Sequence, residues 1–117
     1  MLAVTSSTSE DHKGRGRTVI RVEGDVSMSS LPRFVDSMNR ELATCDTSVI
    51  LVDLDAVDGI DDAGLGILLG FAARARNTNR RFGIVASAPS IRGRLADTRL
   101  DHAVDVFGSL LDAGRMG

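Results

Sequence analysis

The chain has 117 residues, 43% hydrophobic and 26% charged, which fits one globular domain and excludes a disordered chain. Its net charge of −2 and its lack of Trp and Tyr argue against binding to nucleic acid, which needs basic surface and stacking side chains. A single cysteine, Cys45, excludes an intramolecular disulfide and suits a reducing compartment.

The N-terminus lacks the charged start and the long apolar run of a signal peptide. The longest apolar stretch, residues 65–73, is interrupted by Gly66 and Gly70 and falls short of the roughly 20 residues that span a bilayer. We therefore expect a cytoplasmic protein without direct membrane insertion.

The first third of the chain predicts a strand and a helix. Residues 1–17 begin with apolar side chains and then turn polar, which leaves open a flexible segment or a short edge strand followed by a loop. Residues 18–24 are rich in β-branched side chains and predict a strand that ends at Gly24. Ser29 or Ser30 can cap the following helix, with Pro32 in its first turn. Apolar residues then recur at helical spacing: Leu31, Phe34, Val35, Met38 and Leu42.

The rest of the chain continues this alternation. Residues 48–54 form an apolar run typical of a central strand, and residues 55–62 predict an acidic turn. A helix is expected over residues 63–77, with an inward face of Leu65, Leu68, Leu69, Ala72 and Ala75. The remaining predicted elements are a strand at 82–86, a short helix from 89 with Ile91 and Leu95 facing inward, a short strand at 103–107 and a helical turn at 109–113.

Alternating strands and helices predict an α/β domain with right-handed crossovers. We expect a mixed, mostly parallel sheet of four to five strands, packed with three to four helices. The domain is assigned to residues 18–113, between an N-terminal segment of residues 1–17 and a tail of residues 114–117.

Residues 49–71 carry the most functional information, because a buried strand leads through an acidic turn into a helix. In open α/β sheets, ligands and partners dock at this end of the strands. Asp61 and Asp62 can cap the helix, where Gly64, Gly66 and Gly70 resemble a dinucleotide-binding turn. The two carboxylates would repel a pyrophosphate, so close helix packing is the favoured interpretation of the glycines.

This stretch resembles the signature of STAS domains of the anti-sigma factor antagonist class, an apolar strand with an Asp followed by I-D-S-[ST]-G-L-G. The matching residues are Asp53, Ile60, Asp61, Gly64, Leu65, Gly66 and Leu69. The segments 24–27, 89–92 and 100–102 also resemble motifs of that family, so the likeness extends from Thr18 to Phe107.

The resemblance implies a single STAS-like domain that takes part in partner switching and performs no catalysis. Antagonists of this class bind an anti-sigma factor, usually a serine-kinase type ATPase, and thereby release a sigma factor for transcription. The kinase then phosphorylates a Ser or Thr in the S-[ST]-G turn, which separates the two proteins. The resemblance implies neither a cofactor nor a metal.

The chain departs from this pattern at the phosphoacceptor position, which is Ala63, and at the preceding position, which is Asp62. Alanine has no hydroxyl group and cannot be phosphorylated. The favoured interpretation is an antagonist that binds constitutively. Two alternatives are a permanent negative charge supplied by Asp62, and control at Ser27, Ser29 or Ser30 in the neighbouring turn.

The expected docking surface combines the turn at 24–30, the turn at 59–66 and the exposed face of the following helix. Its candidate residues are Asp25, Ser27, Ser29, Asp61, Asp62, Ala63, Gly64, Leu65, Gly66, Ile67, Gly70, Phe71 and Arg74. The carboxylates of Asp53, Asp55, Asp58, Asp61 and Asp62 miss the spacing of a calcium loop and are interpreted as a solvated docking edge with helix caps. Two other roles stay open, a scaffold subunit of a stress-signalling or lipid-transport assembly and a small nucleotide-binding domain. A homodimer is also open as the oligomeric state.

Overall fold

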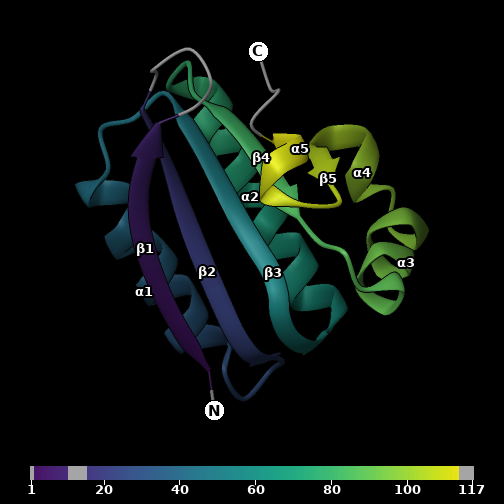
Figure 1. Ribbon diagram of the computed structural model, residues 1–117. Coiled ribbons are helices and arrows are strands. Elements are labelled where there is room, and N and C mark those ends of the chain that lie inside the picture. The colour runs from purple at the N-terminus through teal and green to yellow at the C-terminus, as the bar shows by residue number, and fades with distance from the viewer. Residues whose placement is uncertain (1, 11–15, 114–117) are drawn as a thin grey trace.

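The computed structural model describes residues 2–10 and 16–113, which form five strands and five helices (Figure 1). The strands are β1 (Ala3–Glu10), β2 (Gly16–Val26), β3 (Val49–Ile60), β4 (Arg81–Val85) and β5 (Asp105–Phe107). The helices are α1 (Leu31–Thr44), α2 (Asp62–Asn77), α3 (Pro89–Asp97), α4 (Leu100–Ala103) and α5 (Leu110–Ala113). No helix of these residues is long and apolar enough to cross a membrane.

The five strands form one mixed sheet in the order β1-β2-β3-β4-β5. β1 pairs antiparallel with β2, and every later neighbour is parallel, which confirms the predicted α/β class (Figure 1). Residues 3–10 are thus an edge strand. Residues 11–15, which follow this strand within the N-terminal segment of residues 1–17, and the tail at 114–117 lie outside the described residues.

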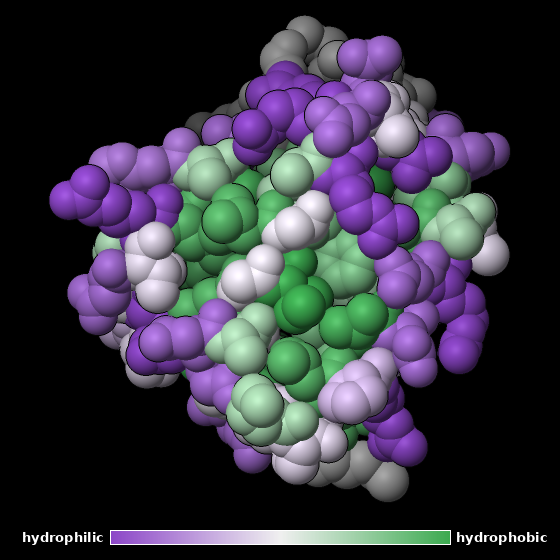
Figure 2. All heavy atoms as spheres, turned by 180° about the vertical axis from the view of Figure 1, so that it is seen from behind, coloured by the Kyte–Doolittle hydropathy of each residue, from purple (hydrophilic) through white to green (hydrophobic). Residues whose placement is uncertain are grey.

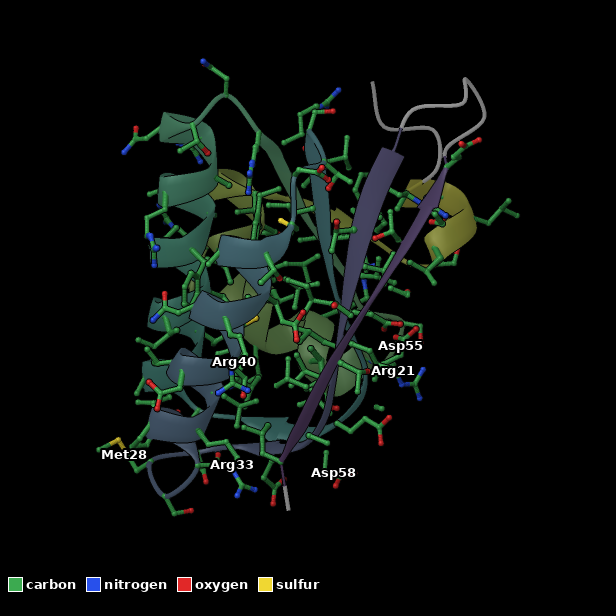
Figure 3. All side chains as sticks on the ribbon, turned by 90° about the vertical axis from the view of Figure 1, so that its left-hand side faces the viewer. Arg21, Met28, Arg33, Arg40, Asp55 and Asp58 are labelled. Carbon is green, nitrogen blue, oxygen red and sulfur yellow. The ribbon has the colours of Figure 1, made fainter. Side chains whose placement is uncertain are left out.

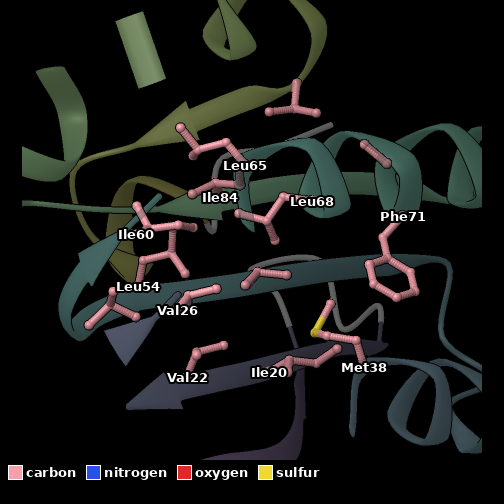
Figure 4. Packing of buried hydrophobic residues seen from close by; sticks show 14 of the residues in the cluster. Ile20, Val22, Val26, Met38, Leu54, Ile60, Leu65, Leu68, Phe71 and Ile84 are labelled. Atoms are coloured by element: carbon pink, nitrogen blue, oxygen red, sulfur yellow. The ribbon is translucent and has the colours of Figure 1, made fainter. Parts of the chain in front are cut away.

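The main core lies between the sheet and the helices α1 and α2, which cover the face turned away from the viewer in Figure 1. Fully buried aliphatic side chains of β2, β3 and α2 interlock there (Figure 4). A smaller cluster on the opposite face includes Val19, Leu51, Val85 and Ala113, so α5 covers that face beside β4. The two apolar clusters, one on each face of the sheet, anchor the parallel strands and so fix the positions of their carboxyl ends.

The third strand is longer than predicted, because β3 continues through the expected acidic turn to Ile60. Val57 and Ile60 are each 7% exposed, whereas Asp55 and Asp58 face solvent. β2 also passes Gly24, its predicted end, and follows β3 as far as Val26 with two register shifts. Gly24 has a φ of 95°, a conformation that favours glycine. It lies at the second register shift, between Gly24 and Asp25, after which β2 continues to pair with β3.

Two residues of α2 exchange their predicted environments. Leu69, expected to face inward, is 43% exposed, whereas Phe71, expected on the docking face, is only 4% exposed. Phe71 lies beside Met38 in the core (Figure 4). An aromatic ring removes more apolar surface from water than a leucine side chain, so the helix is rotated to bury it.

At Gly64, α2 packs closely against β2 and β3. A Cβ atom at this residue would lie 2.7 Å from Cγ1 of Val26 and 2.9 Å from Cγ1 of Ile60. The close-packing interpretation of this glycine is therefore correct, and its backbone is buried.

Replacing Gly64 with alanine is expected to destabilise the domain by about 1–3 kcal/mol, because the added methyl group overpacks a rigid site. Gly66→Ala is the matched control, since a Cβ there meets nothing within 4 Å. Urea unfolding should show a gain of up to about 1 kcal/mol for that control. Equal stabilities of the two variants would contradict the packing seen around Gly64.

Candidate partner-docking site

Two turns meet at one edge of the sheet. β2 and β3 are parallel neighbours, and Asp25 pairs with Gly59 just before both strands end. The N–H of Asp61 donates a hydrogen bond to the carbonyl of Val26 over 3.0 Å. The two segments that the sequence assigned to docking are therefore side by side in the fold.

The first turn is organised around Ser30. Its Oγ donates to the carbonyl of Asp25 over 2.8 Å and accepts a hydrogen bond from the N–H of Ser27 over 3.0 Å. Ser30 is the N-cap residue of α1, but its side chain accepts no bond from the helix, so the predicted capping contact is absent. The hydroxyl groups of Ser27 and Ser29 lie 3.2 Å apart, and Ser29 is exposed.

The second turn starts α2 with a side-chain cap from Asp61. Its Oδ1 accepts the N–H of Gly64 over 3.0 Å, and its carbonyl accepts the N–H of Leu65 over 3.1 Å. The extended backbone of Asp61, with ψ 176°, places the carboxylate over the helix start. The predicted capping role of Asp61 is confirmed.

Replacing Asp61 with alanine is expected to lower the free energy of unfolding by about 1 kcal/mol, because the N–H of Gly64 loses its acceptor. Asp61→Asn should retain most of that stability, since an amide oxygen also caps helices. Urea denaturation of both variants measures the difference. A loss as large for asparagine as for alanine would assign the effect to charge and not to the cap.

Asp62 does not cap the helix but pairs with an arginine of α3. Arg94 Nη2 donates to Oδ1 of Asp62 over 2.7 Å, and Arg94 Nε donates to the carbonyl of Ile60 over 3.3 Å. The Asp62 side chain is 80% exposed, so the pair adds little stability. Its consequence is electrostatic, because Arg94 offsets the negative charge next to Ala63.

The acidic residues are held by separate partners. Asp53 is 5% exposed and accepts the N–H of Asp55 over 2.9 Å, so it belongs to the interior and not to a solvated edge. Asp55 Oδ1 accepts the N–H and the hydroxyl of Ser87 over 2.8 and 3.0 Å. Within residues 2–10 and 16–113, no three His, Cys, Asp or Glu side chains are grouped to hold a metal ion.

An apolar groove lies between α1 and α2 and extends along α1 to the turn before it. The part between the helices, of about 220 Å³, is lined by Val35, Asn39, Gly66, Ile67, Gly70, Phe71 and Arg74. The second part, of about 380 Å³, shares Val35 with the first and lies along α1 and the preceding turn, lined by Met28, Leu31, Pro32, Val35 and Asp36. Figure 2 shows apolar side chains gathered at the centre of this face, inside a polar rim. We call this feature the α1–α2 groove.

Met28 is 71% exposed and projects outward from the turn before α1 (Figure 3). Leu31 and Val35, which the sequence assigns to the buried stripe of α1, are only partly buried, and both line the groove. Only Phe34 and Met38 of that stripe are fully buried. Leu31 still packs against the core, whereas Val35 does not, so the apolar stripe of α1 extends beyond the core at Val35. That excess apolar residue is the feature of the sequence that indicates this part of the site.

The structure divides the predicted site residues into two groups. One group reaches the surface at the two turns and along α2. The surface group consists of Asp25, Ser27, Ser29, Asp61, Asp62, Ala63, Gly66, Ile67, Gly70 and Arg74. Gly64, Leu65 and Phe71 form the second group, because all three are buried. Of these, only Phe71 lines the α1–α2 groove.

Gly66 and Gly70 are exposed within α2, and a Cβ at either position would meet nothing within 4 Å. Each glycine inside a helix costs about 1 kcal/mol relative to alanine. Packing within the domain gives no reason for that cost at these two positions. Both glycines line the α1–α2 groove, where they leave the helix backbone open to close approach.

Comparison with known proteins places this geometry in a known class. The crystal structure of an anti-sigma factor antagonist from Mycobacterium paratuberculosis is 28% identical, with a TM-score of 0.73 over 95% of this chain and 91% of that one. The antagonist SpoIIAA in its unphosphorylated form is 15% identical, with a TM-score of 0.72 over 98% and 95% of the two chains. SpoIIAA in its phosphorylated form, described as a Bacillus cell fate determinant, gives 14% identity and a TM-score of 0.66 over 98% and 100%.

The fold is therefore the one that anti-sigma factor antagonists adopt. The sequence model of the STAS domain matches residues 8–113. The chain belongs to the STAS domain family.

Proposed function

We propose that this protein is an anti-sigma factor antagonist that binds a serine-kinase type ATPase and so releases a sigma factor for transcription. The observation that carries the proposal is the pair of exposed glycines, Gly66 and Gly70, on the groove beside the two turns. Their stability cost is accounted for if a partner approaches the helix backbone at this face. The antagonist from Mycobacterium paratuberculosis, similar along 95% of this chain, supports the same role.

In this proposal the protein is not switched by phosphorylation at the α2 turn. Ala63 is partly exposed in the first turn of α2, at the acceptor position of the family pattern, and carries no hydroxyl. The Asp62 carboxylate is paired with Arg94, so it adds less net charge than a free carboxylate would. These two features support constitutive binding over permanent mimicry of a phosphate.

The experiment is capture of the tagged full chain from a lysate of its own cells, followed by titration of the purified partner. Recovery of an ATPase-type anti-sigma factor, with saturable binding to the purified chain, is the expected result. Recovery of stress-complex or lipid-transport subunits instead would overturn the proposal in favour of a scaffold role. Tight binding of a nucleotide by the isolated chain would favour a nucleotide-binding domain.

A further inference from the structure

A second cavity, of about 430 Å³, lies between the carboxyl-terminal halves of α1 and α2 and the start of β3. Its apolar lining consists of Leu42, Ala43, Ile50 and Ala75. This volume falls in the range of small-molecule sites, roughly 300–1,000 Å³. The cavity shares Asn39 and Arg74 with the α1–α2 groove, whereas Leu42, Ala43, Ile50, Ala75, Thr78 and Arg80 take no part in the proposed docking of a protein partner.

Two arginines give the cavity its charge. Arg74 and Arg80 both line it, and no carboxylate is among its lining residues. A cavity with apolar walls and two guanidinium groups is complementary to a molecule with an apolar body and a negative head.

Both guanidinium groups are held in place by neutral partners. Arg80 donates to the carbonyl of Cys45 over 3.0 Å and to its Sγ over 3.3 Å. Arg74 donates to Oδ1 of Asn39 over 2.7 Å and lies 5.3 Å from the centre of the Phe71 ring. Each guanidinium has five N–H donors, so both keep donors for a ligand and neither is neutralised by these contacts.

We propose that this cavity binds a small amphipathic anion, with its apolar chain against Leu42 and Ala43, the apolar lining residues that reach the surface, and its carboxylate or phosphate head on Arg74 and Arg80. Arginine suits this role because its planar group can donate two parallel hydrogen bonds to such a head. The site does not depend on the proposed function, since it is built from this chain alone.

Calorimetric titration of the purified full chain tests the proposal with decanoate and decyl phosphate as probes. Acetate supplies a negative head without the chain, and decyltrimethylammonium supplies the chain with a positive head. We expect saturable binding of decanoate, of decyl phosphate, or of both. Acetate and decyltrimethylammonium should bind at least tenfold more weakly. The stronger of the two anions identifies the head group as carboxylate or phosphate. Equal binding of the cation, or no saturable binding of either decyl anion, would overturn the proposal.

Variants locate the site. Arg74→Gln and Arg80→Gln should each weaken binding of the decyl anion about tenfold, because each removes a charge-assisted hydrogen bond. Arg21→Gln is the control of equal charge, since Arg21 lies on the side of the sheet away from α1 and α2 (Figure 3). Ala43→Trp should occupy the cavity and exclude the decyl chain of the probe, although both arginines remain. This variant tests the site even if an arginine variant proves unstable. Binding unchanged in Arg74→Gln and Ala43→Trp would place the ligand elsewhere.

Discussion

Replacing Gly70 with glutamine is expected to stabilise the domain and, at the same time, to weaken partner binding about 30-fold or more. The stability gain should be about 0.5 kcal/mol, because glutamine is a better helix former than glycine and a side chain here meets open space. The binding loss corresponds to about 2 kcal/mol, the scale of a central interface residue. Gly66→Gln should behave in the same way. Urea unfolding and titration with the captured anti-sigma factor measure the two effects.

The opposite signs make this result diagnostic. A variant that loses binding because it unfolds must also lose stability, whereas a side chain that only fills the α1–α2 groove leaves the domain intact. Gly66 and Gly70 have no packing role within the domain, in contrast to Gly64, which lies two residues before Gly66.

Gly93→Gln is the matched control. Gly93 is an exposed glycine inside α3, and a Cβ there also meets nothing within 4 Å. It does not line the α1–α2 groove. The same substitution should therefore stabilise the domain without affecting binding. Weaker binding in this control, or full binding in Gly70→Gln, would remove the groove from the docking surface.

The sequence predicts the order of most elements, because their periodicities are strong and local. The buried run of residues 49–54, the buried Phe34 and Met38 of α1, and the inward Ile91 and Leu95 all appear as expected. The extension of β3 is not predictable in this way. Asp55 and Asp58 resemble a turn, and only the pairing of β3 with the bulged end of β2 makes the segment a strand.

The candidate site is predictable in position but not in detail. The motif places Ala63 and Asp61 at the start of α2, and the order of strands brings the 24–30 turn next to it. Which side chains reach the surface depends on the rotation of α2, which the burial of Phe71 determines. The ion pair of Asp62 with Arg94 joins residues 32 positions apart and has no local signal in the sequence.

The α1–α2 groove shows the same limit. Val35 and Leu31 follow the helical repeat that predicts core positions, so the pattern alone assigns them to the interior. The spacing between the two helices leaves Val35 on a groove wall that the glycines of α2 also line, and Leu31 lines the part of the groove along α1. A wide apolar stripe on one helix and glycines on the next are separate observations until the fold places them together.

Replacing Ala63 with threonine is expected to create the missing phosphorylation switch. The captured ATPase should transfer the γ-phosphoryl group of ATP to the new hydroxyl oxygen, releasing ADP and the hydroxyl proton. The added charge of about −1.5 to −2 then lies beside the apolar groove, and binding of the phosphorylated protein should fall at least tenfold. Mass spectrometry of the 58–66 peptide and titration before and after ATP measure both steps.

The wild-type protein and Ala63→Val serve as controls for this variant. Valine has nearly the shape of threonine without its hydroxyl group, so it separates the steric effect of the side chain from that of the phosphate. Both controls should leave the 58–66 peptide unmodified and should bind equally before and after ATP. Phosphate mapped to this peptide in the wild type would overturn the interpretation of Ala63. A threonine variant that is phosphorylated yet still binds would show that this turn lies outside the interface, although the proposed antagonist role could still hold.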